Sequence, residues 1–118
     1  MRHPEAISQK QLVAWFRLQY PQYEDLLAVF ANGENVGPRR MAELKRLGLV
    51  PGQPDLLLSI ARQGRNGLYI EMKAPKGRLR ENQIRIHEKL RDQNFKVVVP
   101  HGFIEARDEI DNYLGTML

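Results

Sequence analysis

The feature that most constrains the fold is a pair of apolar segments joined by a short loop rich in glycine and asparagine. The segments are residues 55–61 and 68–73, and residues 62–67 between them read Arg-Gln-Gly-Arg-Asn-Gly. Glycine and asparagine tolerate the positive φ angles that tight hairpin turns need. The two segments are therefore predicted to be antiparallel strands of one sheet.

The register of this hairpin decides which side chains share a face. If the loop closes with Ala61 opposite Gly67, three further pairs follow: Ser59 with Tyr69, Leu57 with Glu71, and Asp55 with Lys73. Directly opposed side chains lie on the same face of a sheet. Asp55, Glu71 and Lys73 are thus expected to gather on one side, whereas a slip of one residue would move Asp55 to the other side.

Helical and strand patterns surround the hairpin. A helix is predicted over residues 4–20, a buried strand over 26–31, a short helix from Pro38 that ends at Gly48, a strand over 95–99 and a helix over 104–114. The short helix is expected to turn Met41, Leu44 and Leu47 inward. Two helical faces are defined by steps of four, three and four residues: Glu5, Gln9, Leu12 and Phe16 on the first helix, and Leu79, Gln83, Ile86 and Leu90 on a helix after residue 78.

The composition excludes several kinds of site. The chain has 118 residues, which is the usual size of one domain, and we assign residues 1–118 to a single domain. It has no cysteine, which excludes disulfides, zinc fingers, iron–sulfur clusters and thiol nucleophiles, and three scattered histidines do not make an imidazole metal site. A metal ion is therefore expected to bind mainly through oxygen atoms.

Positive charge is concentrated in the middle of the chain. Residues 62–96 carry 10 basic and 4 acidic side chains, against 7 and 6 in residues 1–61 and 1 and 4 in residues 97–118. Such a surplus suits a polyanion such as nucleic acid, although a solvated surface gives the same pattern. The N-terminal residues lack an apolar targeting core and no apolar run approaches membrane-spanning length, so we expect an intracellular protein.

Asp55, Glu71 and Lys73 form the one constellation with evident chemistry. Two carboxylates on one face repel each other unless a cation lies between them, and Mg²⁺ prefers such oxygen ligands. A bound Mg²⁺ would lower the pKa of a water molecule and stabilise charge on a phosphate, while Lys73 orients that water and neutralises developing charge. The pattern predicts phosphodiester hydrolysis.

Simpler interpretations of each residue remain open. Glu71 and Lys73 alternate with apolar residues, as on the solvated side of an amphipathic strand. Asp55 after a proline is typical of a turn. Gln83 is a polar residue near a helix boundary, and Glu5 suits the N-terminal end of a helix dipole.

The order of these motifs resembles the PD-(D/E)XK nuclease superfamily and, within it, the VRR-NUC family. The matching pieces are Asn32-Gly33-Glu34, Arg39-Arg40, Leu47 to Leu56 with the sequence Leu-Gly-Leu-Val-Pro-Gly-Gln-Pro-Asp-Leu, Glu71-Met72-Lys73, Gln83 and Val97-Val98-Val99. They span almost the whole chain. Gln53 stands where the family often has valine.

The resemblance implies an α/β fold with a PD-(D/E)XK nuclease core, in which a central mixed β-sheet is flanked by helices. It implies a Mg²⁺ or Mn²⁺ ion on Asp55, Glu71 and the Met72 carbonyl, with Lys73 catalytic and Glu5 and Gln83 supporting. Small members of the family resemble viral or phage enzymes that act as homodimers on branched DNA such as four-way junctions.

The leading hypothesis is therefore a structure-selective DNA endonuclease of phage replication, recombination or repair. A restriction-like or general DNA nuclease and a catalytically idle DNA-binding module are the alternatives. Phosphate contacts are predicted from Lys76, Arg78 and Arg80 after the second strand of the hairpin, with Arg39 and Arg40 as a second basic cluster. Candidates for a dimer interface are the C-terminal apolar residues Tyr113, Leu114, Met117 and Leu118, although packing on the chain's own sheet would also explain them.

Overall fold

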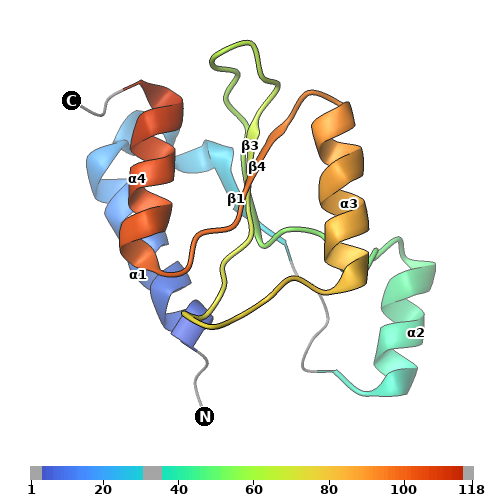
Figure 1. Ribbon diagram of the computed structural model, residues 1–118. Coiled ribbons are helices and arrows are strands. Elements are labelled where there is room, and N and C mark those ends of the chain that lie inside the picture. Colours follow the sequence, from blue (N-terminus) through green and yellow to red (C-terminus); the bar gives the residue numbers. More distant parts are fainter. Residues whose placement is uncertain (1–3, 31–35, 116–118) are drawn as a thin grey trace.

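The computed structural model describes residues 4–30 and 36–115 (Figure 1). The elements follow in the order α1 (Pro4–Gln19), η1 (Pro21–Leu26), β1 (Leu27–Val29), α2 (Pro38–Arg46), β2 (Leu56–Leu58), β3 (Leu68–Ile70), α3 (Glu81–Asp92), β4 (Lys96–Val98) and α4 (Phe103–Leu114). The motif residues Asn32, Gly33 and Glu34, and the interface candidates Met117 and Leu118, lie outside the described residues.

The sheet is mixed, with the strand order β1-β2-β3-β4. Strand β2 is antiparallel to both of its neighbours, β1 and β3, whereas β3 and β4 are parallel. A parallel pair needs a crossover connection, and α3 supplies it. Helices α1 and α4 lie on one side of the sheet and α3 on the other (Figure 1), so the predicted mixed sheet flanked by helices is confirmed.

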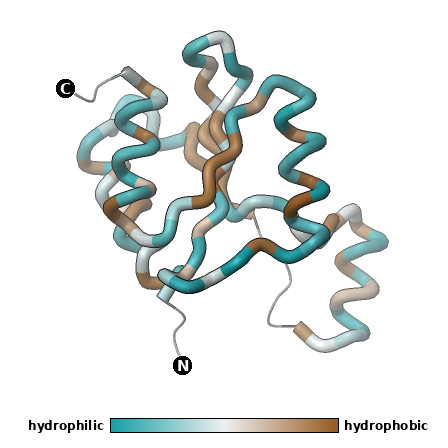
Figure 2. The backbone as a smooth tube through the Cα atoms, in the orientation of Figure 1, coloured by the Kyte–Doolittle hydropathy of each residue, from teal (hydrophilic) through white to brown (hydrophobic). Residues whose placement is uncertain are grey.

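The main core lies between the sheet and the pair of helices α1 and α4. The apolar strands at its centre stand out in Figure 2. Its members are buried side chains from both helices and three strands: Leu12, Phe16, Leu56, Leu58, Leu68, Ile70, Val98, Ala106, Ile110 and Tyr113. The Tyr113 hydroxyl donates a hydrogen bond of 2.6 Å to the Ile60 carbonyl, which satisfies its one polar atom inside the core.

The hairpin register differs by two residues from the predicted one. Leu57 pairs with Tyr69, where Glu71 was expected. The turn is tighter than expected, since Arg62 bridges Arg65 around Gln63 and Gly64, which both have positive φ angles (54° and 74°). Between the Leu58–Leu68 pair and the Arg62–Arg65 bridge, the first strand advances by four residues and the second by three. The first strand therefore contains one extra residue, which forms a bulge. A shift of two residues preserves the face, and the predicted gathering of Asp55 and Glu71 survives.

Other expectations about burial were wrong. The strand predicted as buried, now β1, is an edge strand in which Ala28 and Val29 are exposed. Leu47 was expected to face inward and is 78% exposed, because α2 buries no residue completely and extends away from the sheet (Figure 1).

Two of the four interface candidates pack on their own core. Tyr113 is fully buried and Leu114 is partly buried against the core cluster. The structure thus favours the alternative interpretation of these two residues. No helix within residues 4–30 and 36–115 has both the length and the apolar character that a membrane crossing requires.

Candidate functional site

Asp55 and Glu71 lie side by side where strands β2 and β3 leave their paired segment. Asp55 precedes Leu56 and Glu71 follows Ile70, and Leu56 pairs with Ile70. The register therefore places Asp55 and Glu71 opposite each other, on the face that α3 covers. Asp55 Oδ2 accepts a hydrogen bond of 2.8 Å from the backbone N–H of Met72. The Asp55 carboxylate is therefore fixed against the peptide that follows Glu71.

Lys73 and Gln83 meet across the same face. The Lys73 ammonium donates a hydrogen bond of 3.1 Å to Gln83 Oε1, and the same oxygen accepts one of 2.8 Å from the N–H of Arg80. Gln83 thus caps the first turn of α3 and also holds the lysine. The interpretation of Gln83 as a helix-boundary residue is confirmed, and its supporting role in a nuclease site stays a prediction.

His87 joins this group and was missed by the sequence analysis. It lies one helical turn after Gln83 on α3, is fully buried, and has Nε2 3.2 Å from Glu71 Oε1. Burial lowers the pKa of His87 most strongly; the positive charges of Arg91 and Lys73 act in the same direction, and Asp55 opposes them. The i, i+4 spacing from Gln83 was the signal that could have found it.

Glu5 lies in the first turn of α1 and is half-buried. No hydrogen bond or ion pair within the described part of the chain joins it to Asp55, Glu71 or Lys73. Its supporting role stays a prediction.

Comparisons with known proteins decide the family. The family model described as the VRR-NUC domain matches residues 4–103. The chain belongs to the VRR-NUC family. A solved structure described as a VRR_NUC domain protein has a TM-score of 0.84 and 24% identity, with 98% of this chain and 92% of that chain covered, which shows a shared fold. A search of curated proteins found no match.

Membership of the VRR-NUC family implies a nuclease-type function that acts on DNA. Nucleases of this type commonly use divalent metal ions. Across residues 4–30 and 36–115, no group of three or more His, Cys, Asp or Glu side chains is arranged to hold a metal ion. Mg²⁺, however, usually keeps several water molecules and binds through one or two carboxylates together with substrate phosphate. Asp55 and Glu71 with the Met72 carbonyl fit that sparse set of oxygen donors.

The predicted DNA-contacting residues of this VRR-NUC domain are all exposed. Lys76, Arg78 and Arg80 follow Lys73 on the loop that leads into α3, and Arg39 and Arg40 lie in the first turn of α2. Arg40 forms an ion pair of 3.0 Å with Glu43. The pair is exposed and therefore weak, so Glu43 competes little with another anion for Arg40.

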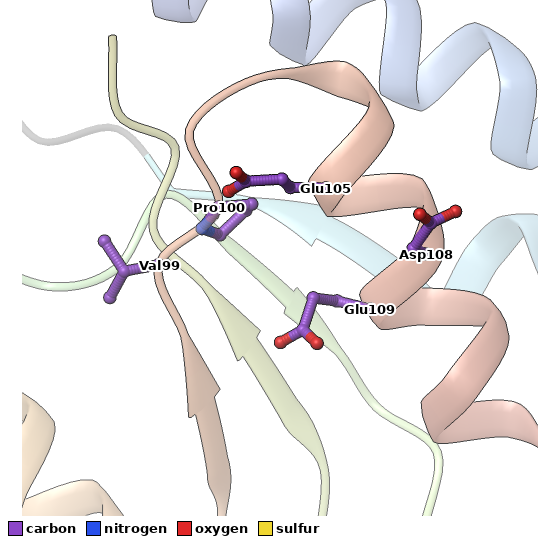
Figure 3. Close-up of a pocket in the computed structure, with 5 residues that line it drawn as sticks. All are labelled: Val99, Pro100, Glu105, Asp108 and Glu109. Atoms are coloured by element: carbon purple, nitrogen blue, oxygen red, sulfur yellow. The ribbon is translucent and has the colours of Figure 1, made fainter. Parts of the chain in front are cut away.

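The α4 side of the VRR-NUC domain has the opposite character. A hollow of about 290 Å³ is lined by Val99, Pro100, Glu105, Asp108 and Glu109 (Figure 3). Its three carboxylates would repel a phosphate backbone. The loop that carries Lys76 and Arg78 reaches this end of the domain, since the Gly77 carbonyl lies 3.1 Å from His101 Nε2 and the His101 N–H donates a hydrogen bond to Glu105.

Proposed function

We propose that the protein is a divalent-metal-dependent DNA endonuclease with its active site at Asp55, Glu71 and Lys73. The observation that carries the proposal is the meeting of these three residues with Gln83 on one face of the sheet. The interpretation of Glu71 and Lys73 as the solvated side of an amphipathic strand leaves two features unexplained. Glu71 is 2% exposed, and Lys73 is hydrogen-bonded to Gln83 of α3.

The proposed chemistry divides between the ion and the chain. A divalent cation, when bound, supplies a Lewis acid for a phosphate oxygen and lowers the pKa of a bound water. Asp55 and Glu71, with the Met72 carbonyl, hold that ion. Lys73 neutralises charge that develops on the phosphate, and Gln83 keeps the ammonium in place by accepting its hydrogen bond of 3.1 Å.

We further propose that the enzyme acts on branched DNA, such as four-way junctions, as a homodimer in phage replication, recombination or repair, inside the host cell. The resemblance to small VRR-NUC enzymes supports this substrate. Exposed basic groups on two separate elements, the loop before α3 and helix α2, suit contact with more than one DNA segment.

The test is cleavage of labelled linear, flap and four-way-junction DNA with Mg²⁺, Mn²⁺, Ca²⁺ or EDTA. We expect Mg²⁺ and Mn²⁺ to support cleavage and Ca²⁺ to support little. An Asp55→Ala protein purified in parallel controls for contaminating nucleases. Cleavage that persists in EDTA with the wild-type protein, and is lost with Asp55→Ala, would refute the metal assignment; binding without cleavage under every condition would indicate an idle DNA-binding module.

A further inference from the structure

His87 contacts Glu71, one of the proposed metal ligands. The imidazole is fully buried in α3, Glu71 is 2% exposed, and the atoms Nε2 and Oε1 are 3.2 Å apart. The two residues come from a helix and a strand 16 positions apart in sequence, so this contact also ties α3 to the end of β3.

An ionised Glu71 carboxylate assigns the donor role in this contact to the imidazole. A carboxylate oxygen accepts hydrogen bonds, so the hydrogen lies on Nε2 and is donated to Glu71. Nδ1 is buried and has no hydrogen-bond partner among the residues that the structure describes. A proton on Nδ1 would have no acceptor there, so the neutral Nε2–H tautomer fits this position.

An apolar side chain at position 87 would avoid the cost of burying an unpaired nitrogen atom. Ile86 and the partly buried Leu90 lie on the same side of α3 without such a cost. What the histidine adds is one directed donor, aimed at the Glu71 carboxylate. Holding Oε1 fixes the position of the other carboxylate oxygen as well.

We propose that His87 is a positioning residue that orients the Glu71 carboxylate for a divalent cation. The inference rests on the proposed function, since it assumes that Glu71 binds the ion. Partners that orient a metal ligand in this way typically contribute 10- to 100-fold to metal affinity or activity. A histidine that merely satisfied the buried carboxylate would affect folding and leave the affinity for the ion unchanged.

The experiment compares three substitutions in the full chain. His87→Gln keeps an amide N–H near the place of Nε2, His87→Asn keeps a polar side chain that ends short of Glu71, and His87→Leu removes the donor. Ile110→Val is the matched control, because it trims the core on the opposite side of the sheet and touches none of these residues. Mn²⁺ affinity is measured without DNA by electron paramagnetic resonance, alongside thermal unfolding in EDTA and the Mn²⁺ concentration that gives half-maximal cleavage.

We expect His87→Leu and His87→Asn to weaken Mn²⁺ binding at least 10-fold, His87→Gln to stay within about threefold of wild type, and Ile110→Val to leave affinity unchanged. If His87→Leu does not fold, the Gln and Asn variants decide between the two roles. Equal Mn²⁺ affinity in wild type and in every folded His87 variant overturns the positioning role alone. Failure of the wild-type protein to bind Mn²⁺ or cleave DNA overturns the proposed function together with it.

Discussion

At the scale of single residues, Lys73 is the position whose substitution tests the proposed chemistry most directly. Lys73 is half-buried and its ammonium is held by Gln83, so it is already oriented before a substrate arrives. Removing one preorganised charge from a transition state usually costs 100- to 1000-fold in rate. We therefore expect Lys73→Ala to cleave DNA at least 100-fold more slowly, measured under single-turnover conditions, with nearly unchanged Mn²⁺ affinity.

The control for this variant is Lys89→Ala, which removes an exposed lysine from α3. It should cleave at close to the wild-type rate. A wild-type rate for Lys73→Ala would contradict the catalytic role and support the interpretation of Lys73 as a residue on the solvated side of an amphipathic strand.

The sequence predicted which residues would meet here better than it predicted how they are held. Alternation along the strand placed Glu71 and Lys73 on one face, whereas only the family resemblance associated Gln83 with them. His87 was missed because histidines were considered only as metal ligands. The i, i+4 spacing from Gln83 places His87 on the same side of α3, but its contact with Glu71 depends on how α3 packs against the sheet.

At the scale of elements, the turn before β2 is fitted closely to α3. Gly52 has a φ angle of +94°, and a Cβ atom there would come within 3.0 Å of the Asn82 amide and 3.1 Å of Ile86 Cδ1. Gly48 has a similar φ angle of +108° with open space around it. The two glycines share backbone strain and differ in packing.

We predict that Gly52→Ala lowers the free energy of unfolding by more than Gly48→Ala does. Strain at a positive φ angle costs about 1–3 kcal/mol for a residue with a Cβ atom, and the clash with α3 adds to this at Gly52 alone. Urea unfolding of both variants measures the difference. Equal losses would mean that the turn can move away from α3 without cost.

The loop before α3 is the second element with a testable role. Lys76, Arg78 and Arg80 are exposed beside the proposed site. Replacing all three with alanine should weaken DNA binding and flatten its salt dependence by up to about 0.9 log unit per lost phosphate contact. Fluorescence anisotropy of labelled duplex DNA at several salt concentrations gives the slope.

A variant with the same net charge provides the comparison for this loop. It carries alanine in place of three basic residues on helices α1 and α4, on the other side of the sheet: Lys10, Arg17 and Arg107. We expect a smaller change in its salt slope. Equal slopes for both triple variants would mean that the loop contributes only general charge.

The elements also show where sequence patterns lose precision. Gly64 and Asn66 correctly indicated a hairpin, but either could have formed the turn, and the choice of Gln63–Gly64 shifted the register by two residues. Burial of β1 was overestimated because an apolar run does not reveal whether a strand has one neighbour or two.

At the scale of the whole molecule, the uneven charge along the chain maps onto the architecture only in part. The basic middle of the chain contains the hairpin, the loop and α3, whereas the acidic C-terminal part contributes the carboxylates of α4 on the other side of the sheet. The two regions are not separated in space: α3 and α4 cover opposite faces (Figure 1), but His101 Nε2, just before α4, lies 3.1 Å from the Gly77 carbonyl in the loop before α3.

The assembly was harder to predict than the fold. Tyr113 and Leu114 were considered for a dimer interface, yet they complete the chain's own core. Apolar residues that do remain exposed include Val29 on edge strand β1 and Leu47 and Val50 after α2, at 53%, 78% and 49%. A sequence does not distinguish an apolar residue that packs in the core of its own chain from one that packs in an interface with a second chain.

We predict a symmetric homodimer with two active sites. Cutting two opposed strands of a junction requires two sites related by a two-fold axis. A stable interface needs about 800 Å² from each partner, which is roughly a tenth of the 7673 Å² surface of this chain. The exposed apolar residues on β1 and after α2 can contribute to it. Light scattering should give about twice the chain mass of 13.7 kDa, and junctions should be cleaved faster than linear duplex. A monomer at micromolar concentration without junction preference would refute the dimer while leaving the nuclease proposal intact.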